Sequence, residues 1–341
     1  MKKLLNTLFV TTQGAYLSRD GETVVVSVEQ KDLLRVPIHT LGGIVCFGRV
    51  TLSPPLMGLC AERQVLVSFL SEWGKFLARI AGPVAGNVLL RREQYRAADS
   101  EPRTAAIARA IVAAKVANAR TVLLRANREN NRRSDGLEEA AALLGRSLER
   151  LARDDLSLET IRGIEGDAAR IYFEVFEQMI GPREEFPFRG RNRRPPLDPV
   201  NALLSFVYTL LVHDLTSALE SNGLDPYVGF LHTERPGRPS LALDLMEELR
   251  PALADRLVLS LINRRQVRAS GFRTLESGAV EMDEDTRREV LTAWQKRKQE
   301  EVRHPFINEQ APVGLFPHLQ ALLLARHLRG DLDAYPALIW R

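Results

Sequence analysis

One histidine and a group of carboxylates lie close together in the stretch from Gly223 to Arg250. His232 ends a short apolar run, a turn segment rich in Pro, Gly and Arg follows it, and an acidic segment comes next. In that segment Asp244 is three residues before Glu247 and four before Glu248. A helix would therefore place all three carboxylates on one face.

An imidazole nitrogen followed by carboxylate oxygens is the donor set of a magnesium- or manganese-type site. Pro251 follows directly and should end the acidic helix. The alternative is a structural histidine beside a solvated acidic face, because clusters of titratable groups are often structural ion pairs. These residues alone leave both interpretations open.

A further carboxylate, Glu165, lies upstream on the apolar stripe of a helix predicted over Ser157 to Ile180. An inward carboxylate is costly unless it is paired or bound to a metal. Gly163 and Gly166 flank it, and each glycine disfavours a helix by about 1 kcal/mol. They indicate close approach of a ligand or another backbone. Alternatively, Glu165 pairs with a buried arginine and the glycines allow tight helix packing.

A basic segment runs from Phe186 to Pro199, and its prolines exclude a continuous helix. Arginines with interleaved aromatic residues suit phosphate contact and base stacking. The alternative is a solvated arginine loop. Arg235 and Arg238, just after His232, are predicted to bind phosphates as well. In the loop, the same role is predicted for Arg189, Arg191, Arg193 and Arg194, beside Phe186 and Phe188.

The elements that would position these groups indicate an α+β protein. With 341 residues, 45% of them hydrophobic and 26% charged, the chain has material for two domains. Residues 1–85 read as short strands in a small sheet assembly, with a hairpin at Asp20-Gly21 and one short helix near Pro55 to Glu62. Beyond them helices are predicted over 104–128, 136–153, 157–180, 201–221, 251–261, 283–302 and 315–329, with a small hairpin over 272–282.

Motifs for several other chemistries are absent from the sequence. There is no Gly-rich phosphate loop with its Lys and Ser/Thr, no Gly-x-Ser-x-Gly elbow, and no CxxC or HExxH pair for zinc. Cys46 and Cys60 lack metal spacing and are predicted to be buried thiols in a reducing cytoplasm. The first residues are interpreted as a strand, and no run is expected to reach the roughly 18 apolar residues of a membrane helix. The net charge of +4 is compatible with a polyanionic partner.

Three blocks resemble, in order, the blocks of one protein family: GIEGDAARIYF, FRGRNRRPPLDPVNALLSFVYTLL and GLDPYVGFLHTERPGRPSLALDLMEELRP. The family is the CRISPR-associated endonuclease and integrase Cas1, which inserts new spacers into CRISPR arrays. The segments MKKLLNTLFVTTQGAYLSRDGETVVV and RGDLDAYPALIW are similar too, so the resemblance extends over essentially the whole chain. The opening and the length resemble the subtype I-C form.

The resemblance implies a site and a domain division. Glu165, His232 and Glu247 would be the ligands of Mg²⁺ or Mn²⁺, with glutamate in place of aspartate at the third position. Asp244 would lie close to the metal as a secondary catalytic candidate, and Glu248 would be a solvated neighbour without a role. A β-rich dimerisation domain would span 1–85, a linker 86–100, and an α-helical catalytic domain that binds DNA and the metal 101–341.

The family also implies an activity and partners. The 3′-hydroxyl of a spacer precursor would attack a phosphodiester at the edge of a repeat. Double-stranded DNA, a second copy of the chain, a small companion adaptation protein and a precursor-trimming nuclease would be the partners, in the cytoplasm and without a membrane. Two alternatives stay open: a structure-selective nuclease acting on branched DNA in repair, and a non-catalytic DNA-binding scaffold whose carboxylates are structural ion pairs.

Overall fold

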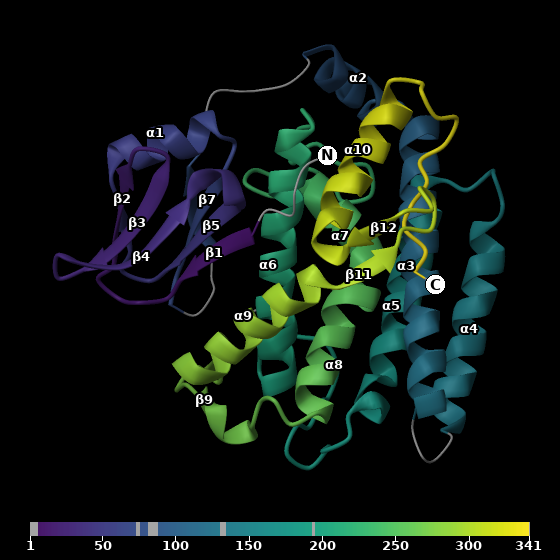
Figure 1. Cartoon of the computed structure of the whole chain (residues 1–341). Coiled ribbons are helices and arrows are strands. Elements are labelled where there is room, and N and C mark those ends of the chain that lie inside the picture. Colours follow the sequence, from purple (N-terminus) through teal and green to yellow (C-terminus); the bar gives the residue numbers. More distant parts are fainter. Residues whose placement is uncertain (1–5, 73–75, 81–87, 130–133, 193–194, 341) are drawn as a thin grey trace.

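The structure, a computed structural model, describes residues 6–72, 76–80, 88–129, 134–192 and 195–340. Strands occupy the first part of the chain and helices most of the remainder, which confirms the predicted α+β class. Figure 1 shows the strand region at one side of a larger helical body. The hairpin, the short first helix and the main helices lie close to their predicted ranges.

Two four-stranded sheets form the strand region. The strands β2 (Tyr16–Asp20) and β3 (Thr23–Val28) make the expected hairpin, whose turn residue Gly21 has φ +58°, a conformation that favours glycine. The first sheet has the order β1 (Asn6–Val10), β5 (Leu41–Phe47), β7 (Leu66–Leu70) and β8 (Phe76–Ile80); the second has β4 (Lys31–Pro37), β3 (Thr23–Val28), β2 (Tyr16–Asp20) and β6 (Thr51–Leu52).

The first sheet contributes to two hydrophobic cores, because successive side chains of a strand point to opposite faces. Ile44 and Cys46 of β5 pack in the small core of the strand region, together with helix α1 (Pro54–Glu62). Val45 and Phe47 of the same strand belong to the large core of the helical body. The strand region is therefore packed directly onto the helices. Cys46 and Cys60 are free and buried, as predicted.

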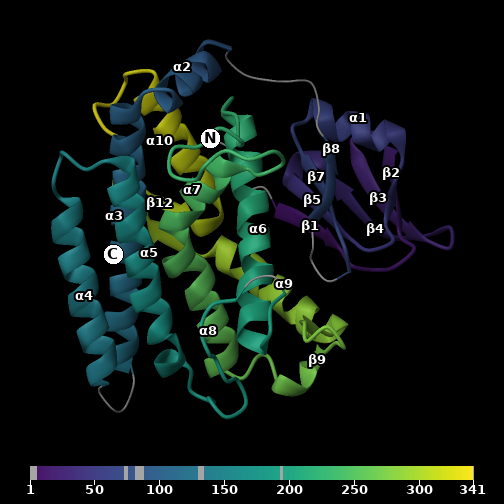
Figure 2. The same cartoon turned by 180° about the vertical axis from the view of Figure 1, so that it is seen from behind.

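The helical body is built around two long helices, α3 (Glu101–Glu129) and α6 (Pro199–Ser221), and both views show other helices lying between them (Figures 1 and 2). Helices α4 and α5 pack against α3, and α7 packs against both α3 and α6. The helices are α2 (Val88–Ala98), α3 (Glu101–Glu129), α4 (Asp135–Leu151), α5 (Leu158–Glu174), α6 (Pro199–Ser221), α7 (Ser240–Leu249), α8 (Arg256–Asn263), α9 (Glu284–Gln299) and α10 (Phe316–Leu328).

Helix α6 corrects one expectation drawn from the sequence. Among the described residues it is the one helix with the length and apolar composition of a membrane span, with a window of mean hydropathy 1.5. Of that window, 67% is buried inside the protein. The apolar run is therefore accounted for by the core that forms around α6.

Residues 86–100, expected to form a linker, contain helix α2 instead. Its Gln94 side chain is fully buried and donates to the carbonyl oxygens of Asp225 and Val228, each at 2.8 Å. These bonds attach α2 to the loop that leads to His232. A linker was predicted over residues 86–100 because this segment is short and mostly polar.

The helices around the candidate site also differ from prediction. The helix predicted to reach Ile180 ends at Glu174, and a 3₁₀ turn (Phe176–Met179) follows. Pro251 does not end the acidic helix: α7 continues through a π-helical segment, Arg250–Asp255, into α8. The wider turn accommodates the missing N–H and the ring of proline. The helix predicted over 283–302 ends at Gln299, and a small hairpin of β11 (Glu301–Arg303) and β12 (Gln310–Pro312) follows.

Candidate metal and catalytic centre

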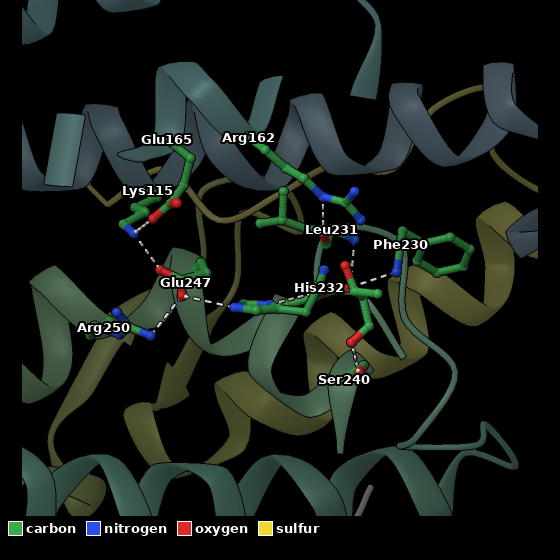
Figure 3. A network of polar contacts seen from close by, with 11 residues as sticks. Lys115, Arg162, Glu165, Phe230, Leu231, His232, Ser240, Glu247 and Arg250 are labelled. Atoms are coloured by element: carbon green, nitrogen blue, oxygen red, sulfur yellow. Dashed lines mark hydrogen bonds and ion pairs between the residues drawn. The ribbon is translucent and has the colours of Figure 1, made fainter. Parts of the chain in front are cut away.

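The predicted acidic residues meet around one lysine. Glu165 of α5 and Glu247 of α7 both form ion pairs with the ammonium group of Lys115 on α3. The Nζ atom of Lys115 lies 2.7 Å from Oε2 of Glu247. His232 approaches from the loop before α7, with its Nε2 3.9 Å from Oε1 of Glu247. Figure 3 shows these side chains converging from three helices and one loop. Glu165, His232 and Glu247 are thus brought together from positions far apart in the chain.

Asp244 orients His232 rather than facing the other carboxylates. One of its oxygens accepts the backbone N–H groups of Phe230 and Leu231, at 2.6 and 2.9 Å. The other accepts the backbone N–H of His232 at 2.9 Å and lies 2.7 Å from its Nδ1. A carboxylate at Nδ1 favours the tautomer protonated there, which leaves the lone pair of Nε2 directed at Glu247.

Two further residues hold the histidine loop in place. Gly229 passes so close to α7 that an added Cβ would lie 2.7 Å from Oδ2 of Asp244 and 2.9 Å from the backbone of Ser240. The loop therefore needs a glycine at this position. Arg162 of α5 donates from Nε to the carbonyl oxygen of Leu231 at 2.7 Å, which links the loop to the helix that carries Glu165.

Glu247 lies among three basic side chains. Burial alone would raise its pKa, but Arg250, Lys115 and His232 outweigh that effect and lower the pKa to about 2. Arg250 donates to its Oε1 at 2.6 Å and stacks over the ring of Tyr208. Arg250 follows Glu247 by three residues, so both side chains lie on the same side of the helix. Glu247 is therefore held ionised.

A buried polar group lies behind Arg250. The hydroxyl of Tyr208 donates to Asp255 at 2.5 Å, and Asp255 is 1% exposed. Burial raises the pKa of Asp255 to about 6, although Tyr208 and Arg250 act in the opposite direction. The guanidinium of Arg250 thus lies between Glu247 and this tyrosine–aspartate pair.

Glu248 is not the solvated neighbour that the sequence predicted. It is fully buried, and it accepts hydrogen bonds from Tyr335 Oη at 2.5 Å and from the backbone N–H of Leu338 at 2.6 Å. Burial raises its pKa to about 7, although these hydrogen bonds and that of Gln320 oppose the rise. Consecutive residues of a helix are rotated by about 100°, so Glu248 faces the C-terminal segment while Glu247 faces Lys115. The three carboxylates of α7 therefore do not share one functional face.

The donor set fits a hard divalent cation. Magnesium and manganese favour ligands of this kind, namely two carboxylates and one imidazole nitrogen. Asp244 holds the other imidazole nitrogen and so orients the ring, as residues outside the ligand set commonly do. Within the described residues, however, no three His, Cys, Asp or Glu side chains are close enough together to hold a metal as they stand. The ammonium of Lys115, between Glu165 and Glu247, accounts for that spacing.

A cleft of about 570 Å³ opens beside Glu165 and Lys115. Lys115 and Glu165 belong both to the ion-paired group and to the wall of the cleft. The remaining wall comes from α5, the basic loop and Arg250, and consists of Ala169, Arg170, Phe173, Glu174, Phe188, Arg189, Gly190, Arg191 and Arg250. The cleft is therefore mostly basic on the side facing the loop.

The basic loop only partly matches its prediction. Phe186 and Phe188 are 1% and 4% exposed and pack in the core, so they are not available for base stacking. Arg189 is exposed at the cleft, whereas Arg191 turns inward to Asn201 and Ser205, at 2.6 and 3.1 Å.

The other arginines predicted to bind DNA differ in position. Arg193 and Arg194 lie outside the described residues. Arg235 is exposed and Arg238 half-buried in the loop between His232 and α7.

Sequence reasoning missed the basic residues of the centre. Lys115 was not among the predicted site residues, yet it lies four residues after Ile111 and four before Ala119, both of which are core residues. A lysine on a buried stripe implies a buried carboxylate partner. Arg250 carried a weaker signal, because its position three residues after Glu247 suggests only an ion pair along one helix face.

The family described as "CRISPR associated protein Cas1" matches residues 8–296. The CRISPR-associated endonucleases Cas1 of Chlorobaculum tepidum and of Rhodospirillum rubrum are 56% and 54% identical to the chain, over 100% of both proteins in each pair. A fusion of a CRISPR-associated exonuclease Cas4 with an endonuclease Cas1, also from Rhodospirillum rubrum, is 38% identical over 96% of the chain and 57% of the fusion.

Solved structures share the fold at lower identity. A Cas1 protein from Thermotoga maritima has a TM-score of 0.82 and 23% identity, covering 96% of the chain and 97% of that protein. A casposase bound to its integration product has a TM-score of 0.84 and 24% identity, covering 99% and 95%. A chain of a Cas6-RT-Cas1–Cas2 complex has a TM-score of 0.83 and 22% identity, covering 100% of this chain and 36% of its own length.

Proposed function

The chain belongs to the Cas1 family, the endonucleases and integrases of CRISPR spacer acquisition, and from this premise we propose that Glu165, His232 and Glu247 form its metal-binding catalytic centre. The observation that carries the proposal is the orientation of His232. Its Nδ1 is held by Asp244, so its free nitrogen faces the same space as Oε1 of Glu247. Buried scaffolding of this kind is not needed for a solvated histidine.

In the proposed reaction the 3′-oxygen of a spacer precursor forms a bond to phosphorus at the edge of a repeat. The bond from that phosphorus to the 3′-oxygen of the repeat strand breaks, the attacking hydroxyl loses its proton, and the departing oxygen gains one. A bound divalent ion would stabilise the charge that develops on the phosphate and lower the pKa of the attacking hydroxyl. With water as the attacking group, the same centre would cut DNA.

The residues of the chain contribute binding and orientation. Glu165 and Glu247 supply anionic oxygens, Asp244 and Arg162 fix the loop of His232, and Arg250 keeps Glu247 ionised. Arg189, Arg191, Arg193, Arg194, Arg235 and Arg238 are proposed to bind phosphates of the DNA. Neutralising exposed members of this set should flatten the salt dependence of DNA binding, because fewer counterions would be released.

The test is a strand-joining assay with a labelled precursor duplex and a supercoiled plasmid that contains a repeat. We expect transfer of label in manganese or magnesium, none in chelator, and none with His232→Ala. His39→Ala, which changes an exposed histidine of the strand region, is the matched control.

Three other outcomes would contradict the proposal. Cutting without joining would favour a structure-selective repair nuclease. Joining that survives both the chelator and His232→Ala would show that the proposed centre is wrong. Metal-independent DNA binding with no reaction would favour a DNA-binding scaffold.

Partners are proposed from the relatives. The structural neighbours include a protein bound to an integration product and a complex that contains Cas2, which supports double-stranded DNA and a small companion of the Cas2 type as partners here. The relative fused to an exonuclease Cas4 supports a separate trimming nuclease and is compatible with subtype I-C, which remains part of the proposal. A cytoplasmic location is proposed from the free, buried cysteines.

A homodimer through the strand region is also proposed. Leu33 and Leu34 are 59% and 44% exposed on the edge strand β4, and Tyr16 on β2 is 45% exposed. Exposed leucines on an edge strand are a liability unless another chain covers them. Light scattering on the purified protein should therefore give the mass of two chains, and a single-chain mass would contradict this part of the proposal.

A further inference from the structure

Lys115 is a buried cation placed between two proposed metal ligands. It is 6% exposed on α3, and its ammonium pairs with Glu165 on one side and with Glu247 on the other (Figure 3). Arg250 adds a second buried positive charge on Glu247, at 2.6 Å. Two carboxylates and two cations therefore balance each other before any divalent ion is present.

That balance opposes binding of a divalent ion. An ion entering between Glu165 and Glu247 would approach the ammonium of Lys115 as well as the carboxylates, and like charges at contact distance repel strongly where Lys115 and Glu247 are buried. A negatively charged phosphate would offset the added charge. The centre would then bind its ion well only when DNA is also bound.

The position of Lys115 offers a way to relieve the repulsion. Its side chain lines the cleft that adjoins the carboxylates, beside Arg170 and Arg189. A lysine has a flexible four-carbon stem, so its ammonium can turn from the carboxylates toward an anion in that cleft. The same side chain could thus pair with the carboxylates without DNA and with a phosphate when DNA is present.

We propose that Lys115 is a resident counter-ion that makes divalent-ion binding depend on DNA: it occupies the space between Glu165 and Glu247 in the free protein and is transferred to a DNA phosphate when the ion enters. This inference rests on the proposed metal centre. It assigns Lys115 a positioning role, because the residue acts through the two carboxylates.

The test measures Mn²⁺ binding without turnover. Loss of the electron-paramagnetic-resonance signal of free Mn²⁺ is titrated with wild-type protein, with and without a duplex whose 3′ ends lack hydroxyl groups. In wild type we expect the duplex to tighten Mn²⁺ binding by about tenfold, from the removal of one unit charge near the ion. Lys115→Met should bind Mn²⁺ about tenfold more tightly than wild type without DNA, and the duplex should add little.

Controls separate this inference from the metal centre itself. Lys296→Met removes an exposed lysine and should leave Mn²⁺ binding unchanged. If Lys115→Met fails to fold, Lys115→Gln, which retains a polar donor, is expected to show the same gain. Unchanged or weaker Mn²⁺ binding in a folded Lys115 variant would overturn the role of Lys115 alone. Binding that persists undiminished in His232→Ala would overturn the metal centre and this inference together.

Discussion

At the scale of single residues, the chemistry of the centre depends on which nitrogen of His232 is free. Asp244 receives three backbone N–H groups and the imidazole Nδ1, so it fixes both the path of the loop and the tautomer. Its contribution is structural support for the centre, since its hydrogen-bonding capacity is already used. A second acidic residue at this spacing from a histidine is therefore not automatically a metal ligand.

Asp244→Asn tests that role. An amide offers one acceptor oxygen to four donors, so the free energy of unfolding should fall by about 1–3 kcal/mol. Mn²⁺ affinity in the presence of DNA should fall about 10–100-fold, because the orientation of His232 is lost. Urea denaturation and Mn²⁺ titration measure the two effects, with the exposed Asp154→Asn as control. Unchanged Mn²⁺ affinity would mean that Asp244 does not set the tautomer.

Much of the centre could be predicted at this scale, and the rest could not for a physical reason. Glu165 drew attention because a carboxylate interrupts an apolar stripe, and His232, Asp244 and Glu247 because of their spacing. Only the resemblance to the Cas1 family singled out Glu165, His232 and Glu247 as ligands. Glu248 was misjudged because its partners, Tyr335 and Leu338, come 87 and 90 residues later. Burial that depends on such distant segments leaves no local pattern.

At the scale of elements, helix α5 presents an open face next to Glu165. Gly163 and Gly166 are exposed, and a Cβ added at either would meet nothing within 4 Å. Tight packing against another helix therefore does not explain them, and the buried partner of Glu165 is a lysine rather than the arginine that the sequence suggested. Of the two explanations for Gly163 and Gly166, close approach of DNA is the one that fits the proposed function.

Gly163→Ala should separate stability from binding. Alanine favours a helix over glycine by about 1 kcal/mol, so the free energy of unfolding should rise by about that amount. Affinity for a duplex should fall, because the methyl group occupies space that the DNA backbone would use. Denaturation and DNA-binding titrations measure both quantities, and Gly145→Ala on α4 is the matched control. A stabilised variant with unchanged DNA affinity would show that nothing approaches this face.

Element boundaries near the centre were the least predictable part of the fold. Pro251 is usually a reliable sign of a helix end, but here the π-helical segment carries the chain past it. Packing stabilises this continuation of the helix, because every residue of the segment from Arg250 to Asp255 is buried. Burial in the core around Tyr208 and Leu253 therefore outweighs the tendency of Pro251 to end the helix.

At the scale of the whole molecule, a polar junction joins the strand region to the helices. His213 of α6 packs against Gly43 of β5, and its Nδ1 lies 2.9 Å from Ser68 Oγ of β7. Lys298 of α9 connects Asp214 and Thr7, at 2.8 and 3.2 Å. The division into strands and helices was predictable from sequence patterns, but this junction was not, because it depends on strands such as β5, whose side chains alternate between two cores.

His213 should make the junction sensitive to acid. Burial lowers its pKa to about 4 in the folded protein, from 6.5 when unfolded. As pH falls, the unfolded chain binds this proton before the folded protein does. The stability contributed by neutral His213 is therefore complete above about pH 6.5 and is lost as the pH falls toward about 4. At about pH 5 the loss is of the order of 1–2 kcal/mol.

His213→Gln should therefore be less stable than wild type near neutrality but lose less stability on acidification. Urea denaturation at about pH 7.5 and about pH 5 measures the difference. His39→Gln, at an exposed histidine, should retain the wild-type pH dependence. Equal pH dependence in His213→Gln and wild type would place the acid sensitivity elsewhere.

The hydrogen bonds from Tyr335 and Leu338 to Glu248 have a consequence for biosynthesis. The helix that carries Glu247 leaves the ribosome long before these partners, which lie 87 and 90 residues further along the chain. The side chain of Asn118 forms hydrogen bonds with the backbone of Leu338 and Trp340, which are synthesised 220 and 222 residues later. The contacts that bury Glu248 and Asn118 behind the acidic helix can therefore form only near the end of synthesis.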